Sequence, residues 1–197
     1  NLFWISILES RWGYDYIQTR DIDASPTQTM YSDGLGGYYG WGENPINLGD
    51  KPLNLHGTYD GQFHTIDNLY INRPDQDVVA LFGRDAEIQN LGLTNVNITG
   101  KRYVAGLVAQ NYGEITNCFV TGSVTGETYV GGICGLSNGH YIEKCFSIAE
   151  ISGETYVGGI CGKAMGLIRN CYSKGKVSGK GSVGGIAGHN GSNDSSP

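Results

Sequence analysis

The sequence predicts an all-β protein, a right-handed parallel β-helix, and two observations support that fold class. A short apolar block recurs at spacings of 26, 27 and 26 residues, and a fixed period of this size indicates one supersecondary unit stacked on copies of itself. Apolar and β-branched residues also fall in short runs separated by glycines, without the 3.6-residue periodicity of an amphipathic helix. The blocks begin at Tyr103, Tyr129, Tyr156 and Ser182, and a fainter copy begins at Asp77.

One unit of the repeat contains three predicted strands. Within residues 103–128 they are the apolar run 104–108, the β-rich run 115–120 and the short run 123–125. Residues 111–113, Asn-Tyr-Gly, form a turn signal between the first two runs. Strands of this length separated by glycine turns are typical of β-proteins. The following unit has one additional residue within 137–140, which predicts an outward loop there.

Stacking the units places like residues above one another in apolar rows. The four rows are Val78, Val104, Val130, Val157 and Val183; Leu81, Leu107, Ile133, Ile160 and Ile186; Ile88, Ile115, Ile142 and Ile168; and Ile98, Val124, Ile151 and Val177. Parallel in-register coils about 4.8 Å apart produce such rows. The strong preference of parallel crossovers for one hand sets the expected right-handed winding.

Two polar rows follow the same period. Asn90, Asn117, Lys144 and Asn170 are expected at corners, where their side chains bond the turns above and below. Lys101, Glu127, Glu154 and Lys180 are expected on a solvated face, where the lysines relieve the repulsion between the two glutamates.

The five cysteines also recur in register. Cys118, Cys145 and Cys171 share one position of the repeat, and Cys134 and Cys161 share another in which other coils carry apolar residues. We therefore predict buried thiols that act as small hydrophobic side chains, with disulfides between stacked coils as the alternative. The sequence contains no Cys-x-x-Cys motif and no Cys–His pair, so we expect no metal and no other cofactor.

Composition excludes several classes of protein. The 32 glycines among 197 residues follow no three-residue period, which excludes collagen. The net charge of −6 argues against a nucleic-acid partner. No apolar run reaches the length of a membrane span, so no span is expected in this segment.

We expect three segments in the chain: an irregular aromatic N-terminal cap with the first strands (1–56), the parallel β-helix (57–190), and a linker-like tail (191–197). A cap is expected because an open edge strand would otherwise pair with other chains. The last block stops near Gly188 without a covering helix, which predicts an uncapped edge that continues in a longer parent protein. The absence of an initiator Met and of a signal peptide leads to the same expectation of flanking domains.

The Gly-Leu-apolar-Gly pattern of residues 106–109, 132–135, 159–162 and 185–188 resembles the GLUG repeat family of bacterial cell-surface proteins. Ala109 departs from the final glycine of the motif, and Ile replaces Leu in three copies. Residues 16–23 and 57–71 resemble the coil that precedes such repeats. The resemblance implies a right-handed parallel β-helix in large secreted adhesins or in non-catalytic regions of surface peptidases. It implies no catalytic residues.

The candidate ligand-binding residues are Tyr38, Tyr39 and Trp41, in an aromatic, glycine-rich stretch outside the repeats. Aromatic rings suit sugar rings or partner side chains, and long irregular segments often carry function. The alternative is that these rings, with Trp4 and Trp12, only cover the first coil.

No catalytic residues are predicted. Asp21 and Asp23 are expected to form local hydrogen bonds, with calcium binding or acid–base catalysis as the alternatives. The stacked acids Glu127 and Glu154 have no partnering Arg or His, which a polysaccharide-cleaving site would need. The histidines are scattered and are expected in loops or on the surface: His56, His64, His140 and His189. A single mixed hydroxyl rank argues against ice binding: Thr99, Thr125, Ser152 and Ser178.

The sequence thus predicts a non-catalytic module of a secreted or cell-surface bacterial protein, acting as an adhesin or as a rigid spacer. Its expected partners are a host or environmental surface protein or a glycan, together with flanking domains, and its expected location is extracellular or at the cell surface. The alternative function is a carbohydrate-binding or polysaccharide-degrading β-helix.

Overall fold

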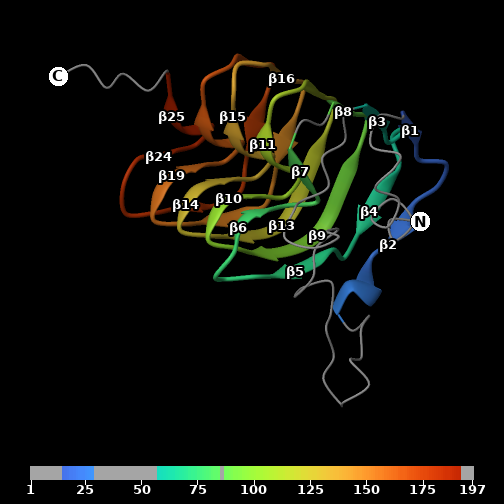
Figure 1. The fold of residues 1–197 in the computed structure, drawn as a ribbon, viewed down its shortest axis with the longest axis horizontal. Helices are drawn as coiled ribbons and strands as arrows, with labels where there is room; N and C mark the ends of the chain where they lie inside the picture. The colour runs from blue at the N-terminus through green and yellow to red at the C-terminus, as the bar shows by residue number, and fades with distance from the viewer. Residues whose placement is uncertain (1–14, 29–56, 85–86, 192–197) are drawn as a thin grey trace.

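A computed structural model describes residues 15–28, 57–84 and 87–191, and these residues form a parallel β-solenoid (Figure 1). Short strands of successive coils pair side by side, always in parallel, and build four sheets that run along the solenoid. The coils advance from the strands nearest the N-terminus at one end to residues 187–190 at the other. The predicted fold class, a parallel β-solenoid, is therefore confirmed.

Sheets I, III and IV take one strand from each coil they cross, whereas sheet II takes two short strands from some coils. Sheet I contains β1 (Tyr16–Ile17), β3 (Thr58–Asp60), β8 (Glu87–Gln89), β12 (Ile115–Thr116), β16 (Ile142–Glu143) and β21 (Ile168–Arg169). Sheet II contains β2 (Ile22–Asp23), β4 (Thr65–Asp67), β9 (Gly92–Thr99), β13 (Phe119–Thr125), β17 (Phe146–Ser147) and β22 (Tyr172–Ser173), joined by β5 (Tyr70–Asn72), β18 (Glu150–Ser152) and β23 (Val177–Ser178).

The remaining two sheets follow in the same coil order. Sheet III contains β6 (Asp77–Val79), β10 (Arg102–Ala105), β14 (Thr128–Gly131), β19 (Thr155–Gly158) and β24 (Val183–Gly184). Sheet IV contains β7 (Phe82–Arg84), β11 (Val108–Asn111), β15 (Cys134–Ser137), β20 (Cys161–Ala164) and β25 (Ala187–Asn190). A 3₁₀ turn, η2 (Ser25–Gln28), follows β2.

The prediction of three strands per coil was wrong, because the chain bends where the sequence pattern showed continuous runs. The predicted run 104–108 is divided between β10 and β11, which leaves Gly106 and Leu107 in the bend. The run 115–120 is divided at Asn117, whose left-handed backbone (φ 52°) turns the chain from sheet I into sheet II. The predicted third strand is instead the end of β13, which passes through an irregularity at Gly122.

The predicted apolar rows are stacked in the interior. Val104 pairs with Val130 and Val130 with Val157, and Ile115 pairs with both Ile88 and Ile142. One member was wrong: Val104 lies beside Val79, not Val78. The fainter copy is one residue shorter between sheets III and IV, so its valine is displaced by one position. Most buried side chains form one hydrophobic core through the described coils, and a second, smaller cluster of Ala80, Ala105 and Ala109 packs against Val78 and Tyr103.

Left-handed residues occupy the same corner of successive coils. The corner between sheets I and II contains Asn90, Asn117, Lys144 and Asn170, with φ between 52° and 54°. Asn117 donates from Nδ2 to Oδ1 of Asn90 at 3.0 Å, which confirms the predicted bonding between corners. Asparagine tolerates this conformation better than most residues, so the choice of residue fits the backbone. The predicted outward loop is also confirmed, since Gly139 and His140 are exposed.

The strands of the last coil lie at the edge of every sheet, and β24 and β25 end sheets III and IV. Val183 is 41% exposed and Ile186 is 38% exposed, whereas Val157 and Ile160, one coil earlier, are fully buried. The apolar rows thus continue into this coil, but nothing among the described residues covers them. The structure describes no residue beyond Gly191 and places none of residues 29–56, where most of the predicted cap lies.

Candidate functional site

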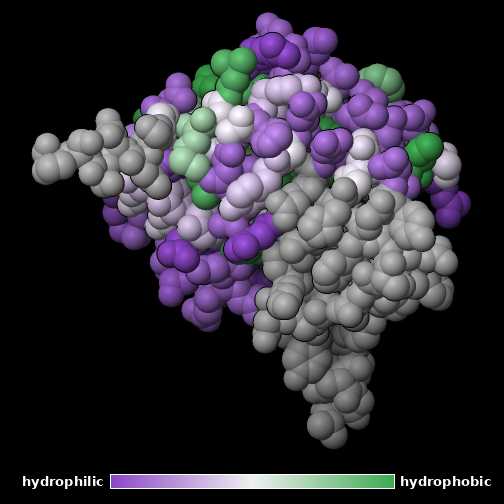
Figure 2. All heavy atoms as spheres, turned by 45° about the horizontal axis from the view of Figure 1, so that its top comes forward, coloured by the Kyte–Doolittle hydropathy of each residue, from purple (hydrophilic) through white to green (hydrophobic). Residues whose placement is uncertain are grey.

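The predicted ligand-binding residues Tyr38, Tyr39 and Trp41 lie outside the described residues, so their arrangement stays a prediction. Among the described residues, two surfaces bring together side chains that are capable of binding a ligand or of acid–base chemistry. One is a stack of tyrosines on sheet III, and the other is a group of acidic and aromatic residues on sheet I. Much of the molecular face in Figure 2 is hydrophilic, with separate hydrophobic side chains between polar ones.

The tyrosine ladder consists of Tyr103, Tyr129 and Tyr156, which lie one above another in β10, β14 and β19. The ring centroids of neighbours are 5.0 and 5.1 Å apart, and the ring planes are inclined by only 3° and 5°. All three residues have left-handed backbones, with φ of 56°, 59° and 58°. Their rings are half-buried. Burial and the neighbouring rings raise the pKa of the Tyr129 phenol, so this phenol is protonated at physiological pH.

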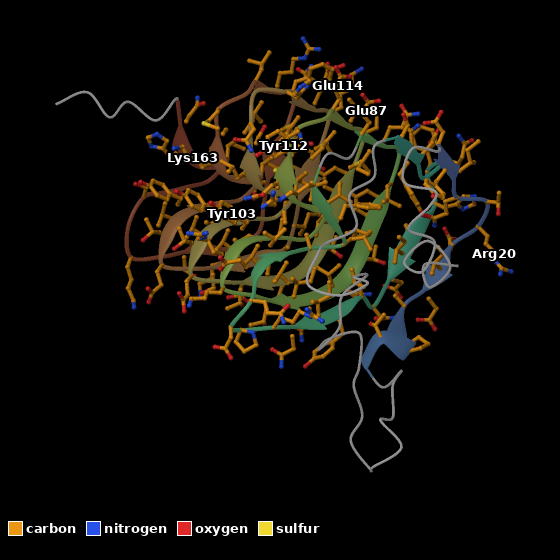
Figure 3. The ribbon with its side chains drawn as sticks, viewed as in Figure 1. Arg20, Glu87, Tyr103, Tyr112, Glu114 and Lys163 are labelled. Atoms are coloured by element: carbon orange, nitrogen blue, oxygen red, sulfur yellow. The ribbon has the colours of Figure 1, made fainter. Side chains whose placement is uncertain are left out.

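Basic side chains lie at both ends of the tyrosine ladder. The guanidinium of Arg102 lies 4.9 Å from the centroid of the Tyr103 ring and forms an ion pair with Asp77 at 3.2 Å. At the other end, His189 meets the Tyr156 ring edge-on with 5.6 Å between centroids. Lys163 Nζ lies 6.0 Å from the centroid of the same ring, at the limit of a cation–π contact. Figure 3 labels Tyr103 and Lys163 on this side of the solenoid.

A second aromatic stack is formed on sheet II by Phe119, Phe146 and Tyr172. Ring centroids are 4.9 and 5.0 Å apart and the planes are inclined by 3° and 1°. This second stack begins next to Gly92. A β-carbon on Gly92 would stand 2.4 Å from the Phe119 ring. Two aromatic stacks thus run along the same solenoid on different sheets, and they differ in that the second has a hydroxyl only at its last ring.

The acidic cluster on sheet I contains Glu87, Glu114, Tyr141, Glu143 and Arg169. Glu87 and Glu114 occupy the same position on neighbouring coils (Figure 3). The Tyr141 hydroxyl donates to Glu114, and Arg169 lies over the Tyr141 ring at 5.0 Å while it pairs with Glu143 at 2.8 Å. Glu127 and Glu154 are therefore not the only acids that stack among the described coils, and this second group includes an Arg partner. The cluster combines two positions of the repeat, one occupied by Glu87, Glu114 and Tyr141 and the other by Glu143 and Arg169.

The electrostatics of this cluster do not favour proton transfer. Arg169 holds the pKa of Glu143 below its usual range, and the hydrogen bond to Glu114 raises the pKa of Tyr141. At neutral pH, Glu143 is thus ionised and Tyr141 is protonated. Acid–base catalysis on a glycosidic bond needs a carboxyl whose pKa is raised towards neutrality.

The predicted structural role of Asp21 and Asp23 is confirmed. Asp21 accepts a hydrogen bond from the backbone N–H of Thr65 at 2.8 Å and contacts His64 at 3.2 Å, which lowers the pKa of its carboxyl. Asp23 accepts from the backbone N–H of Ser25 at 2.9 Å, which likewise lowers its pKa. The Asp21 carboxylate therefore fixes the first coil to its neighbour, and that of Asp23 fixes the turn that follows β2.

Two further aspartates, missed in the sequence, join the next coils. Asp60 accepts from the Nε2 of Gln62 and Gln89 and the Nδ2 of Asn90. Asp67 accepts from Thr94 Oγ1 at 2.6 Å. Two of the amide partners, Gln89 and Asn90, come from the next coil, so the residues next to Asp60 in the sequence do not reveal this role.

All five cysteines are free. Cys134 pairs in register with Cys161, and both are buried, as are Cys118 and Cys145. Burial raises the pKa of the Cys134 thiol. The prediction of buried, hydrophobic thiols is confirmed for these four, while Cys171 in the last coil is only partly buried.

Residues 15–28, 57–84 and 87–191 contain no group of three or more His, Cys, Asp or Glu side chains placed to hold a metal ion. In the same residues, no helix is long and apolar enough to cross a membrane.

The tyrosine ladder was present in the sequence as the first residue of each repeat block, but its stacking was not inferred. The signal that could have revealed it is the recurrence of an aromatic residue at the solenoid period, since in-register coils place such rings directly over one another. The same signal applies to Phe119, Phe146 and Tyr172.

Comparison with protein families identifies the repeat. The GLUG motif is matched at residues 100–125 and again at 153–178. The chain carries GLUG repeats. Each matched GLUG copy begins near the end of sheet II, runs through sheets III, IV and I, and returns to sheet II, so one copy corresponds to one full coil.

The GLUG-containing chain is similar to two much larger proteins. It is 38% identical over 125 residues to halomucin of Haloquadratum walsbyi, which is 61% of this chain and 1% of halomucin. It is 35% identical over 114 residues to a provisionally named Gly-rich membrane protein of Evansella cellulosilytica, which is 55% of this chain and 12% of that protein. The chain thus corresponds to a small part of each relative.

A solved structure has the same arrangement of coils. The crystal structure at 1.30 Å of a provisionally named immunoglobulin A1 protease from Bacteroides ovatus matches with a TM-score of 0.71 and 26% identity. The match covers 92% of this chain and 56% of the solved chain.

Proposed function

We propose that this chain is a non-catalytic, surface-associated module of a larger bacterial protein and acts as a rigid spacer or adhesin. The observation that carries the proposal is the in-register stacking of identical apolar side chains, such as Val104, Val130 and Val157, along the solenoid. A core of this kind grows by one coil at a time without change of cross-section, so the number of coils sets the reach of the module.

Two relatives support a location at the cell surface. The names halomucin and Gly-rich membrane protein both refer to proteins of the cell envelope or its exterior, and the chain spans only a small part of each. The largely hydrophilic face in Figure 2 suits a module surrounded by water. The partners proposed for it are the flanking domains of its parent protein and a surface protein or glycan.

We also propose that the chain has no catalytic activity, and the ion pair and hydrogen bond within the acidic cluster support this. Glu143 is neutralised by Arg169, and Tyr141 donates its hydroxyl proton to Glu114 in a hydrogen bond. The buried thiols of Cys134 and Cys145 have raised pKa values, which disfavours the reactive thiolate. The name of the solved neighbour is that of a protease, so proteolysis is the activity to test first.

The location is tested on intact cells that produce the parent protein. An antibody raised against the folded chain should label intact cells as strongly as permeabilised ones, and external protease should remove the signal. A cytosolic protein detected by a second antibody is the control. Labelling only after permeabilisation would refute the surface location. Cleavage of immunoglobulin A1 or of an acidic polysaccharide by the purified chain would refute the non-catalytic role.

A further inference from the structure

The tyrosine ladder uses a residue that is poorly suited to its backbone. Tyr103, Tyr129 and Tyr156 all have left-handed φ angles, a conformation that bulky L-residues adopt at an energetic cost. At the other recurrent left-handed corner the chain instead has asparagine in three coils, including Asn90 and Asn117. Val78 takes the same left-handed position one coil earlier (φ 63°), so the conformation belongs to the corner, and the advantage of tyrosine there lies in its side chain.

Ring stacking explains only part of that advantage. The second aromatic stack achieves the same spacing and planarity with Phe119 and Phe146, which have no hydroxyl. In the tyrosine ladder no hydrogen bond from the described part of the chain reaches any of the three hydroxyls. Within residues 15–28, 57–84 and 87–191, the rings thus have packing partners, while the three hydroxyls accept and donate no hydrogen bond.

The exposed part of the ladder is its edge. Both faces of the Tyr129 ring are covered, one by Tyr103 and the other by Tyr156, yet the side chain is only half-buried. The surface left to solvent is therefore the ring edge that carries the hydroxyl.

The spacing of the hydroxyl groups along the tyrosine ladder limits which ligands can match it. Hydroxyl groups repeat along a rigid line at the coil spacing of about 5 Å. A β-1,4-linked pyranose chain is extended, carries hydroxyls on both edges, and advances by about one coil spacing for each sugar. Each sugar can then meet equivalent groups on successive coils, and several weak contacts add up along one polymer.

We propose that the tyrosine ladder is a binding stripe for an extended, uncharged β-1,4-linked glycan, with Tyr103, Tyr129 and Tyr156 as the hydrogen-bonding residues. An uncharged chain is favoured because Arg102, the guanidinium that lies over the Tyr103 ring, is already paired with Asp77. This inference gives the proposed surface module a ligand class, and it places the sugar contacts on the solenoid rather than on Tyr38, Tyr39 and Trp41.

The test uses the full chain with cellohexaose and chitohexaose in isothermal titration calorimetry, and maltohexaose as the coiled, α-linked control. We expect the two β-1,4-linked chains to bind more tightly than maltohexaose, and binding to strengthen with length from the disaccharide to the hexasaccharide. Tyr129→Phe removes one hydroxyl and keeps the stacked ring. It should weaken binding about three- to tenfold, the loss expected for one hydrogen bond.

Tyr172→Phe is the matched control because it removes a hydroxyl from the second stack. Binding should be unchanged in this variant, and the melting temperatures of both variants should equal that of the parent chain. Equal affinity for maltohexaose, or unchanged binding in Tyr129→Phe, would overturn the inference. Glycan binding by a protein found only inside cells would refute the surface location alone, and surface labelling without glycan binding would refute this inference alone.

Discussion

A β-carbon placed on Gly159 would stand 2.2 Å from the carbonyl oxygen of Gly185, one coil further along the chain. It would also stand 2.3 Å from the hydroxyl oxygen of Ser173. Gly185 occupies the same place in the next coil, but a β-carbon there would meet nothing within 4 Å. The requirement for glycine at this bend is thus imposed by the coil stacked upon it and not by the local backbone.

Gly159→Ala is accordingly expected to destabilise the chain by about 3 kcal/mol or more, because a backbone carbonyl cannot move aside as a flexible side chain can. Gly185→Ala should change the free energy of unfolding by no more than about 0.5 kcal/mol. Urea denaturation followed by circular dichroism measures both. Equal effects in the two variants would contradict close stacking of the coils at this bend.

The apolar rows predict a second contrast between coils. Ile160 is fully buried and Ile186, its successor in the row, is 38% exposed. Ile160→Ala should cost about 2–5 kcal/mol through lost burial and the cavity left behind, whereas Ile186→Ala should cost less than about 1 kcal/mol. Thermal or urea unfolding gives the comparison. A large loss in Ile186→Ala would mean that residues beyond the described coils cover this edge.

Lowering the pH should weaken the hydrogen bond by which Asn90 on one coil binds the Asp60 carboxylate on the preceding coil. Partial burial alone would raise the pKa of Asp60, but hydrogen bonds from Gln62 and Asn90 outweigh it and hold the pKa below its usual value. The unfolded chain therefore binds this proton at higher pH than the folded chain. The contribution of Asp60 is present above about pH 4 and is lost as the pH falls through the lower folded value.

This pH dependence is measured as the urea midpoint between pH 7 and pH 2.5. Asp60→Asn should lower the midpoint at pH 7 and flatten the acid limb of the curve. Asp75→Asn, which changes an exposed carboxylate, serves as the control and should leave the acid limb as in the parent chain. A parent-like acid limb in Asp60→Asn would show that other carboxylates dominate.

Thiol labelling tests the stacked cysteines. In the native chain only Cys171, which is partly buried, should react with iodoacetamide at pH 8.5, and slowly, because the neighbouring Cys145 thiol raises the pKa of Cys171. In urea all five thiols should react, giving five added groups by intact-mass spectrometry. A mass that shows fewer than five groups in urea without reductant would reveal a disulfide between stacked coils.

The fold could be predicted well from the sequence, and the candidate site only in part. Val104, Val130 and Val157 recur at the solenoid period, and only parallel in-register stacking buries all of them together. The positions of Cys134 and Cys161 followed from the same argument. The acidic cluster escaped prediction because Glu114 aligns with Tyr141 and Glu143 with Arg169, residues of a different kind, so only the short repeat of Glu87 and Glu114 marked it.

By itself, the sequence determined the architecture: the period, the apolar rows and the buried thiols, since like residues at one spacing can be removed from water only by stacking. The tertiary structure alone decided where the chain turns, and with it the four sheets, the substitution of Val79 for Val78 in the first row, and the tyrosine ladder. The physical reason is that a left-handed residue such as Tyr129 redirects its side chain, and this redirection depends on backbone angles that periodicity does not encode.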